Sequence, residues 1–206
     1  MSRKRSVQPS GTTMALEFDS KVLASNALGD PHVRKLAVWL PPGDDSGTVR
    51  GRTSGRGRRF PVLFDLVGFT GSGLAHVNWR PFDENVPERA ARLIADRRMG
   101  PTIIVFPDCF TSMGGNQYVN SSAIGRDADY LTRELIPYVD REFHTLASRE
   151  HRGCFGKSSG GSGAIMHAMR YAPHSGARAD HSRAAPVDLC SSPASPPPRH
   201  HLARSP

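Results

Sequence analysis

The chain has 206 residues, a formal net charge of +8 and an isoelectric point near 10. This length suits one domain, and a hydrophobic fraction of 37% is enough for a buried core, which excludes full disorder. No apolar run is long enough to span a membrane, so we expect no membrane partner. The three cysteines form no close pair, which excludes a zinc ribbon or a disulfide framework and favours a reducing, cytoplasmic compartment.

The excess positive charge lies toward the two ends of the chain. Residues 1–59 carry 11 Lys and Arg against 5 Asp and Glu, whereas residues 60–172 carry 12 of each and residues 173–206 carry 4 against 2. The arginines of the Gly-rich run 49–59 are not interleaved with aromatic residues, which a platform for stacked bases needs. We therefore interpret these segments as solvated linkers and expect no nucleic-acid partner.

The N-terminus does not resemble a signal peptide, because residues 6–13 are polar where an apolar region belongs. Met14 opens a more apolar stretch and is an alternative start to Met1. We expect a basic, disordered extension over residues 1–17 and a folded core over 18–173 with an Arg/Gly-rich loop at 44–59. A low-complexity tail, disordered by its composition, is expected over 174–206.

Short apolar runs alternate with helical patterns along the core. Strands are predicted at 36–40, 61–68, 102–108 and 152–156, and helices at 86–99, 126–143 and 161–171. Gly100 is expected to end the first helix, and Pro137 should kink or restart the second. This alternation predicts an α/β fold, a three-layer sandwich around a mostly parallel sheet, without internal repeats.

The most informative segment is Gly156-Lys-Ser-Ser-Gly160, which follows a predicted strand and precedes a predicted helix. A nucleophile elbow needs this context, with small residues two before and two after the serine, so the pattern selects Ser158, flanked by Gly156 and Gly160. Ser159 does not meet the rule, because Lys157 would occupy a small position. The Ser159 backbone N–H then becomes one donor of an oxyanion hole at the start of the helix.

A second oxyanion donor must come from a loop after an earlier strand. The turn Gly68-Phe69-Thr70-Gly71 follows a predicted buried strand, and Gly68 leaves the approach to the Phe69 N–H open. Taken alone, such a turn is more often a simple strand exit.

Several segments together resemble the putative-esterase family of α/β hydrolases, which includes enterochelin-esterase-like enzymes, S-formylglutathione hydrolases and mycolyltransferases. The resemblance covers roughly residues 18–173, and its segments are 28–43, 60–71, 114–126, 129–143 and 156–161. It implies an α/β-hydrolase fold, Ser158 as nucleophile and the amides of Phe69 and Ser159 as oxyanion donors. Relatives often have His-Gly where this chain has Val67-Gly68, a change that leaves the backbone donor in place. The resemblance also places the Gly114–Tyr118 loop near the serine.

The partners of a catalytic serine are harder to find. In this fold an Asp or Glu and then a His follow the serine, and only 48 residues follow Ser158. The fold is therefore expected to be incomplete at its C-terminal side, through truncation or a frameshift near residues 172–182. The candidates for the missing carboxylate and base are Asp180, His181, Asp188, His200 and His201, with His167 and His174 closer in sequence.

Other chemistry has thin support in the sequence. No metal-ligand spacing, P-loop or dinucleotide fingerprint is present, so we expect neither a metal nor a cofactor. Cys109 and Cys154 are interpreted as small buried hydrophobes. Three interpretations stay open: a serine esterase acting on a small-molecule ester through a Ser158 acyl-enzyme, a catalytically inactive remnant of such an enzyme, and a basic binding module. The oligomeric state and the substrate are not determined by the sequence.

Overall fold

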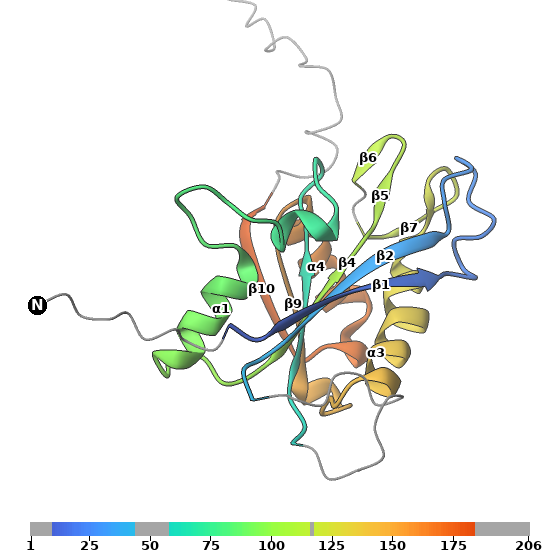
Figure 1. The fold of residues 1–206 in the computed structure, drawn as a ribbon. Helices are drawn as coiled ribbons and strands as arrows, with labels where there is room; N and C mark the ends of the chain where they lie inside the picture. The colour runs from blue at the N-terminus through green and yellow to red at the C-terminus, as the bar shows by residue number, and fades with distance from the viewer. Residues whose placement is uncertain (1–9, 44–57, 116–117, 184–206) are drawn as a thin grey trace, which may run out of the picture.

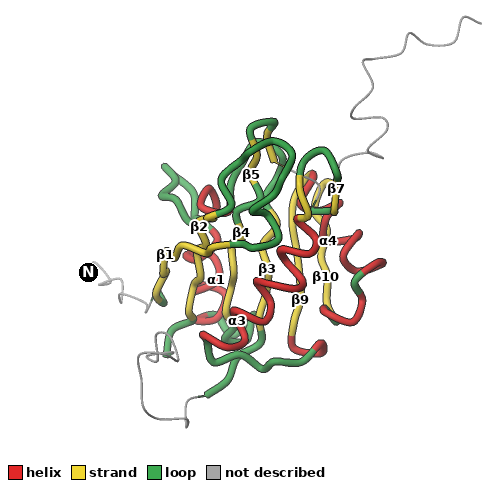
Figure 2. The backbone as a smooth tube through the Cα atoms, turned by 90° about the vertical axis from the view of Figure 1, so that its right-hand side faces the viewer, coloured by secondary structure: helices red, strands yellow, loops and turns green. Residues whose placement is uncertain are grey.

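The fold is built on one six-stranded sheet. The computed structural model describes residues 10–43, 58–115 and 118–183. The sheet has the strand order β1-β2-β4-β3-β9-β10, and Figure 2 shows these strands side by side. Their bounds are Thr12–Asp19 for β1, Val33–Leu40 for β2, Val62–Leu66 for β3, Ile103–Pro107 for β4, Arg152–Ser158 for β9 and Ala177–Arg183 for β10.

The sheet is parallel where the candidate site lies. Strand β3 pairs in parallel with both β4 and β9, and β10 extends the parallel part beyond β9. Only β2 against its two neighbours is antiparallel. The central strands are almost wholly buried, as expected for strands covered on both faces. The carboxyl ends of β3, β4 and β9 therefore meet at one edge of the sheet, where ligand sites of open α/β folds form.

Helices cover both faces of the sheet. Helix α1 (Val86–Ala95) lies on one face, and α3 (Ile136–Glu142) and α4 (Ser159–Arg170) lie on the other (Figure 2). Each face has its own apolar core, one built around Trp39 and Phe106 beside α1, the other around Leu66, Tyr130 and neighbours beside α3 and α4. This three-layer arrangement agrees with the predicted fold class.

Short elements connect these layers, and several lie above the carboxyl edge of the sheet. They are η2 (Gly73–His76), β5 (Phe110–Thr111), β6 (Gly114–Gly115), β7 (Asn120–Ser121), β8 (Gly125–Arg126), α2 (Asp127–Asp129), η3 (Tyr130–Leu135), η4 (Arg149–His151) and η5 (Ala172–His174). Figure 1 shows the β5–β6 hairpin rising above the end of β4.

Of two local expectations about helices, the expected end at Gly100 differs from the structure, and the expected restart at Pro137 agrees with it. Helix α1 ends at Ala95, and Arg97 rather than Gly100 adopts the left-handed conformation, with a φ of 56°. The chain can turn there because a single residue outside a helix tolerates this region at modest cost. The helix predicted over 126–143 is restarted before Pro137: a π-helical segment, η3, precedes α3, and Pro137 lies in the first turn of α3.

The structured part extends past both expected boundaries. Strand β1 begins at Thr12, inside the expected extension, because Met14, Leu16 and Phe18 alternate toward the core. At the other end, β10 runs through Ala177–Arg183, inside the expected tail, because its backbone pairs with β9. Residues 44–57 of the expected loop and residues 184–206 lie outside the described residues. Among the described residues, no helix has the length and apolarity needed to cross a bilayer.

Candidate active site between β9 and α4

The backbone turns sharply at Ser158, where strand β9 passes into helix α4. Ser158 has φ 57° and ψ −122°, a conformation that L residues rarely adopt. Such strain costs on the order of 1–3 kcal/mol and persists only where the surrounding structure enforces it. The turn places the Ser158 side chain at the carboxyl edge of the parallel sheet and at the N-terminus of α4, where backbone amides have no intrahelical partner.

The two glycines that flank Ser158 are required by close backbone packing. A Cβ at Gly156 would lie 2.5 Å from the carbonyl oxygen of Gly160, and a Cβ at Gly160 would lie 2.5 Å from the carbonyl carbon of Leu66. Real Cβ atoms are essentially never closer than 3.0 Å to a neighbour. The sequence pattern around the serine therefore reflects contact of α4 with β9 and β3, in addition to the turn itself.

The structure also separates the two adjacent serines. Ser158 is partly exposed, whereas Ser159 is 2% exposed and its hydroxyl has no hydrogen-bond partner among the described residues. A buried hydroxyl cannot be reached by a substrate. Ser159 is the first residue of α4, and its backbone N–H, not its hydroxyl, is the group that belongs to the candidate site.

The loop that follows β3 lies directly beside Ser158. A Cβ at Gly68 would be 3.6 Å from the Ser158 Cβ, so the two backbones approach closely. The Gly71 N–H donates to the Gly68 carbonyl at 3.1 Å, which fixes the peptide plane shared by Gly68 and Phe69. The Phe69 N–H belongs to that plane and has no protein acceptor among the described residues. It is therefore free to donate to a bound group.

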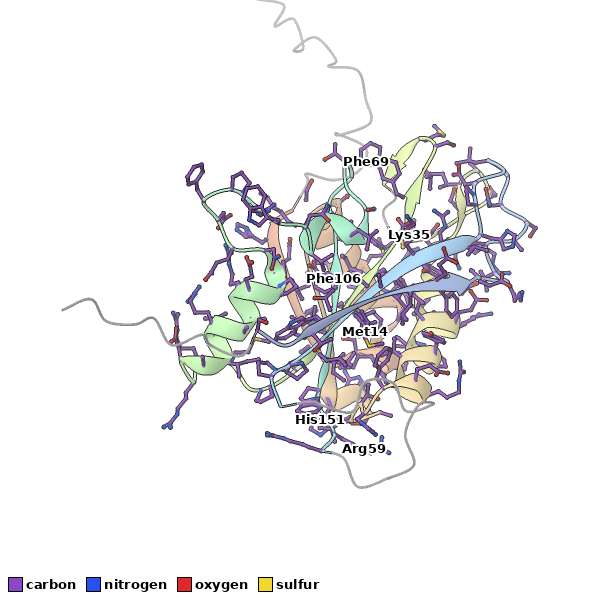
Figure 3. The ribbon with its side chains drawn as sticks, viewed as in Figure 1. Met14, Lys35, Arg59, Phe69, Phe106 and His151 are labelled. Carbon is purple, nitrogen blue, oxygen red and sulfur yellow. The ribbon has the colours of Figure 1, made fainter. Side chains whose placement is uncertain are left out.

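Gly114 and Gly115, at the start of the predicted Gly114–Tyr118 loop, pack against this turn. The Gly115 N–H donates to the Phe69 carbonyl at 2.6 Å, and a Cβ at Gly114 would lie 2.7 Å from the Phe69 ring. Figure 3 shows Phe69 at the edge of the fold opposite Arg59 and His151, next to the β5–β6 hairpin of Figure 1. The Phe69 side chain is 48% exposed, so an apolar ring borders the space beside Ser158.

A buried carboxylate–histidine pair near this loop was not predicted from the sequence. Asp65, on β3, is 1% exposed, and one of its oxygens lies 2.6 Å from His76 Nδ1 in η2. Burial raises the pKa of Asp65, while the hydrogen bond with His76 opposes that rise. The pair joins the strand before the Gly68–Gly71 turn to the helix after it. No sequence motif marks the pair, because its partners are brought together only by the turn between them.

The predicted acid and base partners of Ser158 lie on several different segments of the chain. Asp180 lies on β10 against the first turn of α4, where a Cβ at Gly161 would be 3.2 Å from its carboxyl carbon. His181 is the next residue along the same strand and so faces the opposite side of the sheet. His174 lies in η5. Asp188, His200 and His201 lie outside the described residues.

His167 is occupied by a structural contact. It is buried on α4, and its Nε2 lies 2.7 Å from the carbonyl oxygen of Tyr118. Burial lowers the pKa of His167, so the neutral ring, with the proton on Nε2, donates to that oxygen.

The two described cysteines are buried thiols. Burial raises the pKa of Cys154 to about 11 and raises that of Cys109 well above its ordinary value. Neither thiol is a ready nucleophile near neutral pH, because the thiolate is the reactive form. In the part of the chain that the structure describes, no three His, Cys, Asp or Glu side chains cluster as metal ligands would.

Comparisons with known proteins agree on one family. The family described as "Putative esterase" matches residues 32–193, so the chain belongs to this esterase family. Esterase Rv1288 of Mycobacterium tuberculosis strain H37Rv is 35% identical over 138 residues. That alignment includes 64% of this chain but 26% of the relative, so the matched part is about a quarter of the relative's length.

Solved structures share the fold. A ferulic acid esterase superimposes with a TM-score of 0.66 at 22% identity, over 92% of this chain and 62% of that one. The fluorophosphonate-binding serine hydrolase FphF of Staphylococcus aureus also gives 0.66, at 17% identity, over 87% of this chain and 60% of that one. The fold is therefore that of the α/β-hydrolase esterases, and this chain spans less than two thirds of each of these structures.

Proposed function

We propose that the chain is a carboxylic ester hydrolase in which Ser158 forms the acyl-enzyme. The observation that carries this proposal is the strained turn at Ser158, between a parallel strand and a helix N-terminus, with Gly156 and Gly160 in backbone contact on either side. Membership of the esterase family and the neighbouring amide of Phe69 support the same reaction.

In this reaction Ser158 Oγ attacks the carbonyl carbon of a small-molecule ester, and a base takes the hydroxyl proton. The carbonyl oxygen becomes an oxyanion, which accepts hydrogen bonds from the N–H groups of Phe69 and Ser159. Both donors are backbone groups fixed by packing, so they need no reorganisation as charge develops. The alcohol leaves with a proton, and water then attacks the acyl-enzyme and releases the carboxylic acid and free Ser158.

The base and its carboxylate are sought among the acidic and histidine residues that follow Ser158. The sequence candidates are Asp180, His181, Asp188, His200 and His201. Without a base, the oxyanion hole and binding alone leave a residual rate of roughly 10³–10⁴ over water. A chain with a formed elbow and no base is the inactive remnant that the sequence analysis left open.

A fluorophosphonate probe tests this proposal, because it labels a serine that is both nucleophilic and beside an oxyanion hole. We expect covalent labelling of the wild-type chain, loss of labelling in Ser158→Ala, and retention of labelling in the matched variant Ser159→Ala. Hydrolysis of p-nitrophenyl acetate is measured on the same samples.

The combination of results separates the alternatives. Labelling with turnover supports an esterase with its base in place. Labelling without turnover indicates a serine that is activated but whose acyl-enzyme is not hydrolysed. A folded wild-type chain that is not labelled at all contradicts the proposal and favours the inactive remnant.

A further inference from the structure

Tyr118 has a strained backbone in the interior of the protein. Its φ is 59°, in the left-handed region that bulky residues avoid, and its side chain is 2% exposed. Strain of this kind persists only where the surroundings determine the conformation, and it is concentrated at functional sites. The reaction proposed for Ser158 gives Tyr118 no role, so its strained, buried position needs a separate explanation.

The hydroxyl of Tyr118 is hydrogen-bonded to the backbone just after β3, in the segment that leads to the candidate oxyanion donor, the Phe69 N–H. It donates to the carbonyl oxygen of Val67 at 2.6 Å, and burial raises the pKa of Tyr118 well above its ordinary value, so the hydroxyl keeps its proton. The carbonyls of Gly68 and Phe69 are held in turn by the amides of Gly71 and Gly115. Three consecutive peptide groups around the Phe69 N–H therefore have fixed orientations.

The same tyrosine contacts the helix that begins at the nucleophile. Its carbonyl oxygen accepts a hydrogen bond from His167 Nε2 at 2.7 Å. Its ring packs on Gly163, where a Cβ would lie 2.6 Å from the ring. Both contact residues lie on α4, the helix whose first amide is the other candidate donor. Tyr118 thus contacts the supports of both donors, on two separate segments.

We propose that Tyr118 is a positioning residue for the oxyanion hole: it sets the Phe69 amide, through Val67, relative to the N-terminus of α4. This inference rests on the proposed esterase function and assigns to Tyr118 no contact with the substrate. It explains why a strained tyrosine is kept at a position where a glycine would adopt the same backbone without cost. Its expected effect is on the transition state, because the oxyanion forms only there.

The chain offers a matched control for removal of this hydroxyl. Tyr130 is also fully buried, but its hydroxyl has no hydrogen-bond partner among the described residues. Tyr118→Phe removes a hydroxyl that donates, and Tyr130→Phe removes one that does not. Both variants keep the ring and its packing, so a difference between them reports the hydrogen bond to Val67.

Two measurements test the inference. In steady-state hydrolysis of p-nitrophenyl acetate, Tyr118→Phe should lower kcat about tenfold with KM changed by less than about twofold, while Tyr130→Phe leaves both unchanged. In amide hydrogen exchange, which needs no activity, the amides of Gly71 and Gly115 should exchange about tenfold faster in Tyr118→Phe alone.

Unchanged exchange at Gly71 and Gly115 in Tyr118→Phe would overturn the inference, and so would faster exchange with an unchanged kcat. A lower melting temperature with a wild-type kcat would show a purely structural role and overturn it as well. If Ser158 is not labelled in the wild-type chain, the proposed function fails, while the exchange data still decide whether Tyr118 orders the loop.

Discussion

Gly160 offers the sharpest test of how the turn at Ser158 is built. In Gly160→Ala the new Cβ would lie 2.5 Å from the carbonyl carbon of Leu66 and 2.8 Å from the carbonyl oxygen of Val67. Ordinary contact begins near 3.4 Å, and the carbonyl oxygen of Leu66 lies nearer still to the new Cβ, so α4 and the end of β3 must separate by more than about 0.9 Å, the difference between 3.4 and 2.5 Å. Both sides of the contact are backbone, so neither can give way by rotating a side chain.

The separation is costly because β3 is held between β4 and β9. Overpacking in a well-packed core costs typically 1–3 kcal/mol, and with backbone on both sides we expect the upper end, about 3 kcal/mol. For a chain of this size that corresponds to a melting temperature lower by about 6–12 °C. The displaced segment leads to Phe69, so Ser158 labelling should also slow.

Thermal and urea unfolding of purified variants measure this cost, and Gly100→Ala is the matched control. Nothing lies within 4 Å of a Cβ at Gly100, and its φ is not in the left-handed region, so that variant should be neutral or slightly stabilised. A Gly160→Ala protein that melts within about 2 °C of Gly100→Ala would refute the reasoning, because α4 and β3 would then not be in contact at this point.

Two further predictions concern the same region. Burial lowers the pKa of His167 below its ordinary value of 6.5. As the pH falls, His167 therefore takes up a proton in the unfolded chain before it does in the folded chain, and the free energy of unfolding keeps its full value above pH 6.5. The free energy of unfolding should fall as the pH drops below 6.5 toward the pKa of the folded chain, by up to about 1.4 kcal/mol per pH unit. If urea unfolding shows the same pH dependence of this free energy in His167→Gln as in wild type, the prediction is wrong. At Phe69 the backbone and the ring are separable: Phe69→Pro removes the N–H and should lower kcat by about 10²–10³, whereas Phe69→Ala keeps it and should stay within about tenfold of wild type. Equal kcat values for these two variants, both folded by circular dichroism, would exclude the Phe69 amide as an oxyanion donor.

Much of the architecture was predictable because strands and helices leave local patterns. The apolar runs at 61–68 and 102–108 contain β3 and β4, and their continuous hydrophobicity follows from burial on both faces. Strand β1 was missed because its residues are only half-buried and its partner, β2, lies more than ten residues away. The end of α1 was misplaced because Arg97, and not a glycine, takes the left-handed conformation.

The sequence by itself determined which serine to consider. Small residues at 156 and 160 select Ser158 over the adjacent Ser159, and the elbow rule is local, so a short pattern is enough. It also located the Gly68–Gly71 turn, because glycines mark places where the backbone must approach another group.

Only the tertiary structure decided what surrounds that serine. Tyr118 meets Val67 across 51 positions of the chain and His167 across 49, and His76 meets Asp65 through a turn that no pairwise pattern encodes. Such contacts depend on where each loop lies in space once the sheet has formed. The chemistry of Ser158 is thus indicated by five consecutive residues, whereas the orientation of the amides beside it depends on segments that folding brings together.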